Sequence, residues 1–212
     1  MNTVLEYNLA ELQALLDRDA ILRLVARYLH GIDRMDREMV ASTYHADARD
    51  DHGAFVSAGV DGFLDAIWEE HAEWSFHQHS VTHSLVEVSG DRAVGEHYLV
   101  AILGLDAGAS REQIERQFGP EYVRAREADG KLGNPHMWRL GGRYLDRYEK
   151  RDGEWRFLHR TVRMEWGEKL PNDDWKEGTA ARQGRDACPR DRRDDSYGLF
   201  EWLRGGNAGT QG

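Results

Sequence analysis

Four polar side chains in this sequence have the types and positions that proton transfer needs. Tyr28 and Asp33 stand at the end of an apolar helical stretch and just beyond it. His79 and Arg160 stand among apolar residues in two segments with strand periodicity. A buried histidine or arginine needs a polar partner, because an unpaired buried charge is costly. We expect Asp33 to be the partner of both.

An aspartate beside a histidine stabilises the imidazolium and fixes which ring nitrogen is free to accept a proton. Asp33 and His79 would therefore act as a general base, a role that contributes about 10²- to 10⁴-fold in rate. Tyr28 can donate a hydrogen bond, and Arg160 can stabilise a developing oxyanion or a leaving group. These four residues predict an elimination or enolisation site. Motifs of covalent catalysis and nucleotide binding do not occur.

The same residues also have structural interpretations. Asp33 is as readily explained as a turn or capping residue. His79 and His83 are four residues apart in a strand and should share a face, where His83 is better explained as a wall of the pocket than as a catalyst. His77, His79 and His83 could bind a metal, but no carboxylate stands at firm ligand spacing, so we expect no metal.

Helical and strand periodicity divide the chain into two halves. Residues 8–30 predict two consecutive helices or one kinked helix, and short helices are expected from Asp36 and over 60–74. Strand pairs are expected over 78–88 with 92–103, and over 138–150 with 155–166. This order predicts an α+β fold in which N-terminal helices close a curved antiparallel sheet into a cone-shaped barrel around a ligand cavity.

Two segments lie outside this pattern. Residues 104–137 form a long polar connection with helical character at 110–118, and we expect it to be a lid or an oligomer contact. We expect a domain over 1–170, followed by an extended C-terminal tail over 171–212, with one apolar anchor, SYGLFEWL.

Composition excludes several classes of protein. A formal net charge of −10 and a pI near 5.5 oppose nucleic-acid binding, which requires a basic surface. No run of about 18 apolar residues could span a membrane, and no secretory signal is visible, so we expect a cytoplasmic protein. The single Cys188 excludes an internal disulfide and a multi-cysteine zinc site.

Three stretches resemble a known family: AILRLVARYLHGIDRMDREMVASTYHADA, HSVTHSLVEVSGDRA and GGRYLDRYEKRDGEWRFLHR. Together they are similar to the SnoaL-like branch of the nuclear transport factor 2-like superfamily, over roughly residues 15–166. The resemblance is to cofactor-free lyases of that branch, which include dehydratases, a dehydrochlorinase and formaldehyde lyases acting on lignin-derived diaryl compounds. It implies a homotrimer in which Asp33, His79, Tyr28 and Arg160 are the catalytic residues.

We therefore expect a lyase without cofactor that releases water or formaldehyde from a hydrophobic, hydroxylated aromatic or steroid-like compound. Its binding pocket is expected to be lined by Tyr44, Trp68, His83, Tyr98, Met137 and Tyr144. His83 departs from the asparagine of the dehydrochlorinase. Two alternatives stay open: an isomerase of the ketosteroid type, and a non-catalytic protein that binds small molecules or resembles the assembly subunit of ring-hydroxylating dioxygenases.

Overall fold

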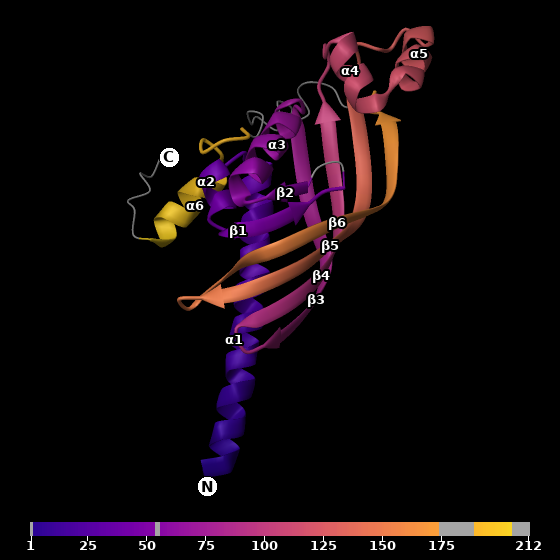
Figure 1. Ribbon diagram of the computed structural model, residues 1–212. Coiled ribbons are helices and arrows are strands. Elements are labelled where there is room, and N and C mark those ends of the chain that lie inside the picture. The colour runs from indigo at the N-terminus through magenta and orange to yellow at the C-terminus, as the bar shows by residue number, and fades with distance from the viewer. Residues whose placement is uncertain (1, 54–55, 174–188, 205–212) are drawn as a thin grey trace.

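The computed structural model describes residues 2–53, 56–173 and 189–204 and contains helices packed against one curved sheet (Figure 1). Its elements in chain order are α1 (Asn2–Asp33), α2 (Arg37–Ala41), β1 (Tyr44–Asp51), β2 (Val56–Ala58), α3 (Val60–Ala72), β3 (Phe76–Ser89), β4 (Arg92–Leu105), α4 (Arg111–Phe118), α5 (Pro120–Ala128), β5 (His136–Arg151), β6 (Glu154–Pro171) and α6 (Asp195–Leu203).

The sheet has six strands in the order β2-β1-β6-β5-β4-β3. The long strands β3 to β6 form a continuous antiparallel meander, and β1 joins β6 in parallel. The predicted α+β class is confirmed. The sheet is curved, but it does not close into the expected barrel, because β2 and β3 remain unpaired edges at opposite ends of the strand order.

Helix α1 is one continuous helix rather than two (Figure 1). Its C-terminal half buries Ile21, Val25, Tyr28 and Ile32, whose spacing of three to four residues places them on one face against the sheet. The helix can turn sharply into α2 because Gly31 lies against Val40, where a Cβ atom on Gly31 would be only 2.8 Å from Val40 Cγ2. This close packing fixes where α1 ends, and Asp33 is its last residue.

The 104–137 connection folds into α4 and α5 at one end of the long strands (Figure 1). Ser110 caps α4 by accepting a hydrogen bond from the Gln113 backbone N–H at 3.1 Å, so the helix predicted at 110–118 is confirmed. The two helices enclose a second apolar cluster with the strands, composed of Trp74, Ala101, Leu103, Leu105, Ile114, Phe118 and Val123. The segment is therefore a packed part of the domain.

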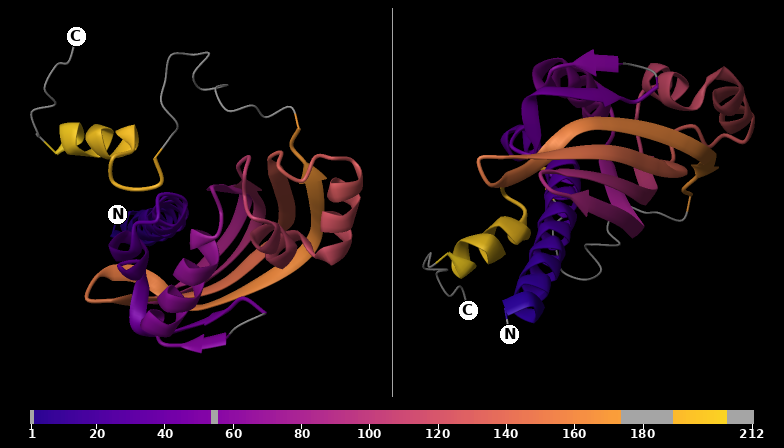
Figure 2. Two further views of the ribbon diagram at one scale, coloured as in Figure 1. Left: turned by 90° about the horizontal axis from the view of Figure 1, so that it is seen from above. Right: turned by 60° about the horizontal axis from the view of Figure 1, so that its bottom comes forward.

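The C-terminal segment 189–204 packs on the end of α1 and on α2 (Figure 2). Arg34 binds Asp194 at 3.1 Å, and the Tyr197 hydroxyl donates to Asp36 at 2.9 Å. Helix α6 occupies the expected anchor within the stretch that we interpreted as an extended tail. Residues 174–188 and 205–212 of that tail, Cys188 included, lie outside the described residues. No helix in the described ranges is long and apolar enough to cross a membrane.

A buried ion pair joins the two central strands. Asp146 on β5 and Arg160 on β6 are direct cross-strand neighbours, with Oδ1–Nε and Oδ2–Nη2 distances of 2.8 and 2.7 Å. Both side chains are fully buried. The carboxylate partner of Arg160 is therefore Asp146 and not Asp33, because the strand register places Asp146 opposite it.

Replacement of Asp146 by Asn should lower the free energy of unfolding by about 3–5 kcal/mol, because it leaves the Arg160 charge buried without its counterion. Urea unfolding of Asp146→Asn and of the wild type measures this difference. The matched control is Glu165→Gln, which breaks an exposed pair with Arg143 between the same two strands and should cost at most about 1 kcal/mol. Equal costs for the two variants would contradict the prediction.

Candidate active site

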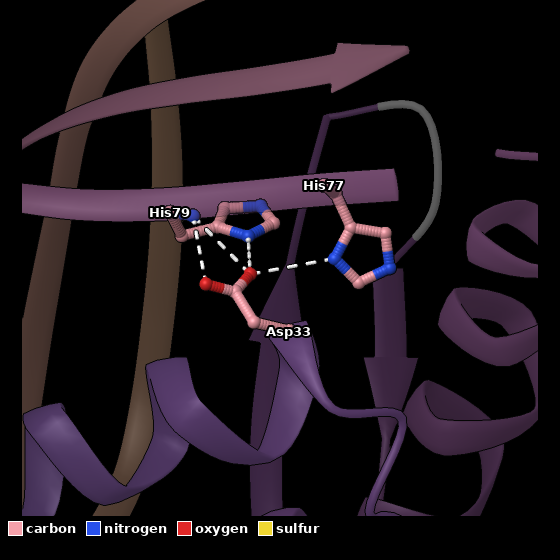
Figure 3. A group of neighbouring side chains, drawn as sticks. All are labelled: Asp33, His77 and His79. Atoms are coloured by element: carbon pink, nitrogen blue, oxygen red, sulfur yellow. Dashed lines mark hydrogen bonds and ion pairs between the residues drawn. The ribbon is translucent and has the colours of Figure 1, made fainter. Parts of the chain in front are cut away.

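Asp33 at the end of α1 meets His79 on β3 (Figure 3). The Nδ1–H of His79 donates to Asp33 Oδ1 at 2.7 Å, and the backbone N–H of His79 donates to Asp33 Oδ2 at 3.0 Å. Both side chains are about nine-tenths buried. Because Nδ1 carries the hydrogen that Asp33 accepts, the lone pair of His79 is on Nε2.

His77 makes a third contact with the same carboxylate, and the sequence analysis missed it as part of the proton-transfer group. It lies two residues before His79 on the same face of β3, and its Nδ1–H donates to Asp33 Oδ1 at 3.3 Å (Figure 3). Its other nitrogen, Nε2, accepts a hydrogen bond from Arg190. Arginine has only donors, so His77 must be neutral with its hydrogen on Nδ1.

These contacts determine the charges of the group. Burial alone would raise the pKa of Asp33, but hydrogen bonds from His77 and His79 outweigh it and lower the pKa to about 2. Burial lowers the pKa of His77 to about 3, despite its bond to Asp33, and the nearby charges of His71 and Arg190 act in the same direction. At neutral pH the site therefore holds a carboxylate beside a neutral His77.

The group also has the composition of a divalent-metal site, since ligand atoms of Asp33, His77 and His79 lie within 4.8 Å of one another. The hydrogen-bonding pattern does not fit that use. Both Nδ1 atoms carry hydrogens donated to Asp33, and Nε2 of His77 is occupied by Arg190. Of the nitrogen atoms of these two histidines, only Nε2 of His79 keeps a free lone pair, so the arrangement suits proton transfer better than metal binding.

His71 on α3 is a further histidine at this place that the sequence analysis did not identify. Its ring stacks on that of His79, with centroids 5.7 Å apart and an interplanar angle of 20°. Its Nδ1 is held by Glu70 and by the carbonyl oxygen of Ile67, whereas its buried Nε2 has no hydrogen-bond partner in the described part of the chain. The helical spacing of α3 gave no sign that His71 would meet β3.

Tyr28 and Arg160 form a second group with Tyr144, Tyr44 and Phe157. The Arg160 guanidinium carbon lies 4.2 Å from the ring centre of Tyr28 and 3.9 Å from that of Tyr144. Among the described residues its buried Nη1 has no hydrogen-bond partner. Tyr44 is buried beside Tyr28 and donates its hydroxyl to Asp50 at 2.8 Å. Burial raises the pKa of the Tyr28 hydroxyl far above its ordinary value.

Two of the expected pocket residues point elsewhere. A bulge between Val81 and His83 shifts the alternation of β3, so His83 is exposed and stacks on Tyr98 with ring centres 4.1 Å apart. His97, the neighbour of Tyr98 on β4, is buried on the opposite face. His83 therefore does not share the face of His79, contrary to the expectation from simple alternation.

The remaining expected pocket residues, Trp68 on α3 and Met137 on β5, are both half-buried. Trp68 packs on the apolar core beneath Arg37. A cavity of about 470 Å³ opens on the outer face of the sheet, between Leu85, Val94, Leu145 and Arg163. It contains neither Asp33 nor His79, so it is separate from the candidate active site.

Comparison with known proteins places this geometry in a family. The family model described as SnoaL-like domain matches residues 13–161. The chain belongs to the SnoaL-like family. The match includes Asp33, His79 and Arg160, but it ends before the segment that carries Arg190.

Several solved structures share the fold at low sequence identity. A hexachlorocyclohexane dehydrochlorinase (LinA) Type2 superposes with a TM-score of 0.61 and 22% identity, over 80% of this chain and 99% of that one. The LinA-type3 dehydrochlorinase of Novosphingobium barchaimii gives 0.58 and 22%, over 79% and 99%. A protein named a putative scytalone dehydratase, from Novosphingobium aromaticivorans, gives 0.56 and 20%, over 74% and 89%. The search of curated proteins finds no match.

The neutral state of His77 makes this SnoaL-like protein sensitive to acid. Its folded-state pKa of about 3 lies below the ordinary value of 6.5, so between these limits the unfolded chain binds a proton that the native protein does not. This group's contribution to stability is complete above pH 6.5 and is lost toward pH 3, by about 1.4 kcal/mol per pH unit.

Urea unfolding of the wild type and of His77→Gln, between pH 8 and pH 4, measures this contribution. Glutamine can still donate to Asp33 and accept from Arg190, but it does not titrate. The loss of stability on acidification should therefore be shallower in the variant by about 1.4 kcal/mol per pH unit below pH 6, with equal slopes above pH 7. Parallel curves throughout would show that His77 is not held neutral.

Proposed function

We propose that this protein is a cofactor-independent lyase in which His79 removes a proton from a hydrophobic, hydroxylated ring compound and a leaving group departs. The hydrogen bond between Asp33 and the Nδ1–H of His79 carries the proposal. It leaves Nε2 as the proton acceptor and places a carboxylate where the imidazolium will form. A buried ionised carboxylate stabilises that cation more strongly than it would in water.

In the proposed reaction, Nε2 of His79 takes a proton from the substrate. The released electron pair forms a double bond as the leaving group departs with its own pair of electrons. Asp33 holds the ring in place and balances its charge throughout the step. When water is the leaving group, the departing hydroxide takes up the proton that His79 has removed. The Tyr28 hydroxyl, whose pKa is raised by burial, is proposed to assist by donating a hydrogen bond to the departing oxygen.

Arg160 is proposed to act on the leaving group or on a developing oxyanion. Its Nη1 hydrogens are free of partners within the described residues, and its positive charge is already balanced by Asp146. Tyr28 stands five residues before Asp33 on α1, a rise of about 7.5 Å along the helix. One helix end therefore contributes to both groups, at opposite ends of the proposed substrate.

The substrate class follows from the aromatic side chains near Tyr28. Tyr44, Tyr144 and Phe157 surround it with ring faces and edges, which favour an aromatic or steroid-like ring system. In one form of the reaction the leaving group is water. In the other form, His79 takes the proton of a hydroxymethyl group, whose oxygen forms the carbonyl of formaldehyde as the carbon–carbon bond breaks. The electron pair of that bond then forms a double bond as a benzylic hydroxyl departs. The proposal includes a homotrimer, which the resemblance to known lyases implies, and a cytoplasmic location, which the sequence analysis predicts.

Asp33→Asn and His79→Gln should each lower kcat by at least about 100-fold, because the first removes the negative charge that stabilises the His79 imidazolium and the second removes the general base itself. The assay follows a panel of hydroxylated aromatic and sterol compounds by mass spectrometry, together with released formaldehyde. Circular dichroism and urea unfolding establish that the variants remain folded. His159→Gln, on the outer face of β6, is the matched histidine control and should keep wild-type turnover.

Loss of activity in the control as well, or full activity in Asp33→Asn, would contradict the lyase proposal. A product that retains every substrate atom and differs only in the position of a double bond would identify an isomerase. A protein that binds these compounds without converting any of them would be a binding protein.

Metal removal should leave turnover unchanged. Of the four imidazole nitrogens of His77 and His79, two carry hydrogens donated to Asp33 and one accepts from Arg190. Proton transfer at the fourth, Nε2 of His79, requires no ion. Dialysis against EDTA, followed by assay with and without added zinc, manganese or iron, tests this directly. Activity that is lost on dialysis and restored by one of these ions would assign Asp33, His77 and His79 to a metal centre instead.

A further inference from the structure

Arg190, in the C-terminal segment, contacts residues of the candidate active site. Its guanidinium group donates to the backbone oxygen of Trp74, to the backbone oxygen of His71 at 3.0 Å, and to Nε2 of His77. The His71 carbonyl belongs to the last turn of α3, and the Trp74 carbonyl belongs to the connection between α3 and β3, the strand that carries both histidines. Arg190 thus joins a part of the chain beyond the matched family domain to the residues around Asp33.

A continuous chain of hydrogen bonds runs from Arg190 to the proposed base. Arg190 donates to Nε2 of His77, whose Nδ1–H donates to Asp33, and Asp33 accepts from Nδ1–H of His79. Each link sets the direction of the next, because a neutral imidazole has one donor and one acceptor. Asp33, which can only accept, and Arg190, which can only donate, hold the hydrogen of His77 on Nδ1 from both sides. Without Arg190, the lone pair on Nε2 of His77 would be free to bind a proton.

The position of Arg190 differs from that of the other arginines in this segment. Arg192 binds Glu38 at 2.8 Å on the surface, and Arg193 is exposed and pairs with Asp191. Arg190 is half-buried, and its buried Nε has no hydrogen-bond partner within the described ranges. Burying a donor without a partner is unfavourable, so anchoring the segment does not by itself explain an arginine here.

We propose that Arg190 is a positioning residue that, together with Asp33, keeps His77 neutral with its hydrogen on Nδ1 and thereby fixes the orientation of Asp33 toward His79. The proposal deepens the proposed function and rests on it for the catalytic consequence. The structural part concerns the protein itself and is measurable without a substrate. Arg190 acts through His77 and is not expected to contact the reacting molecule.

Nitrogen-15 NMR of the histidine side chains tests the structural part. In the full-length wild type at pH 7.5, His77 should show a protonated Nδ1 and an unprotonated Nε2, and the Nδ1–H of His79 should give a downfield proton signal from its bond to Asp33. In Arg190→Met, Nε2 of His77 should become protonated, and the His79 signal should shift or broaden. Arg193→Met, the matched control, should retain both wild-type signatures.

A wild-type His77 that carries its hydrogen on Nε2, or spectra that Arg190→Met leaves unchanged, would overturn the proposal. These outcomes are independent of any activity. A protein with the predicted tautomer that converts no substrate would refute the proposed function and leave the role of Arg190 at His77 intact.

A double-mutant cycle tests the catalytic consequence. Arg190→Met should lower kcat about tenfold, equivalent to the loss of one hydrogen bond, with KM unchanged. In the background of His77→Phe the same change should have no further effect, because the residue through which Arg190 acts is gone. Additive losses in the double variant, or a rise in KM without a fall in kcat, would overturn the positioning role.

Discussion

The candidate site depends on one buried carboxylate, Asp33, that is kept ionised by hydrogen bonds rather than by an adjacent lysine or arginine. Two imidazole N–H groups and one backbone N–H donate to it. A carboxylate in this setting would bind a proton if its donors were absent, and it would then no longer stabilise a charged His79. Every contact that orients His77 and His79 therefore also maintains the negative charge on which the proposed proton transfer depends.

Three segments that are far apart in the chain must come together to form this site. Helix α1 has to end at Asp33, which the close packing of Gly31 on Val40 enforces. Strand β3 has to present His77 and His79 on one face, which its pairing with β4 maintains up to the bulge after Val81. The C-terminal segment binds both α1 and the turn before β3, so the same contacts that hold it also hold these two elements in register.

The buried charge of Arg160 is organised differently. Arg160 has a full counterion in Asp146 and a cage of aromatic rings, so its charge is balanced by the core itself. One guanidinium nitrogen is left without a partner in the described chain. Such an arrangement keeps a strong donor fixed in an apolar setting, where a polar atom of a ligand would be bound more tightly than in water. The two groups have different roles in the proposed reaction. Asp33 orients and charge-stabilises the base, His79, and Arg160 stabilises charge on the leaving group or oxyanion.

The sequence alone determined the features that depend on local pattern. Helical spacing and strand alternation predicted the α+β class, the helix at 110–118 and the meander of long strands. An aspartate at the end of a helix and a histidine among the apolar residues of a strand were enough to predict that Asp33 pairs with His79. Tertiary structure decided the rest. The register of β5 and β6 places Asp146 opposite Arg160. A single extra residue at the bulge in β3 turns His83 away from the face of His79, because alternation predicts which face of the sheet a side chain occupies only while strand pairing is regular. The contact of Arg190 with His77 spans 113 residues, and no local periodicity encodes it. Nor did the pattern indicate that the sheet stays open, since closure depends on how the edge strands β2 and β3 lie relative to each other.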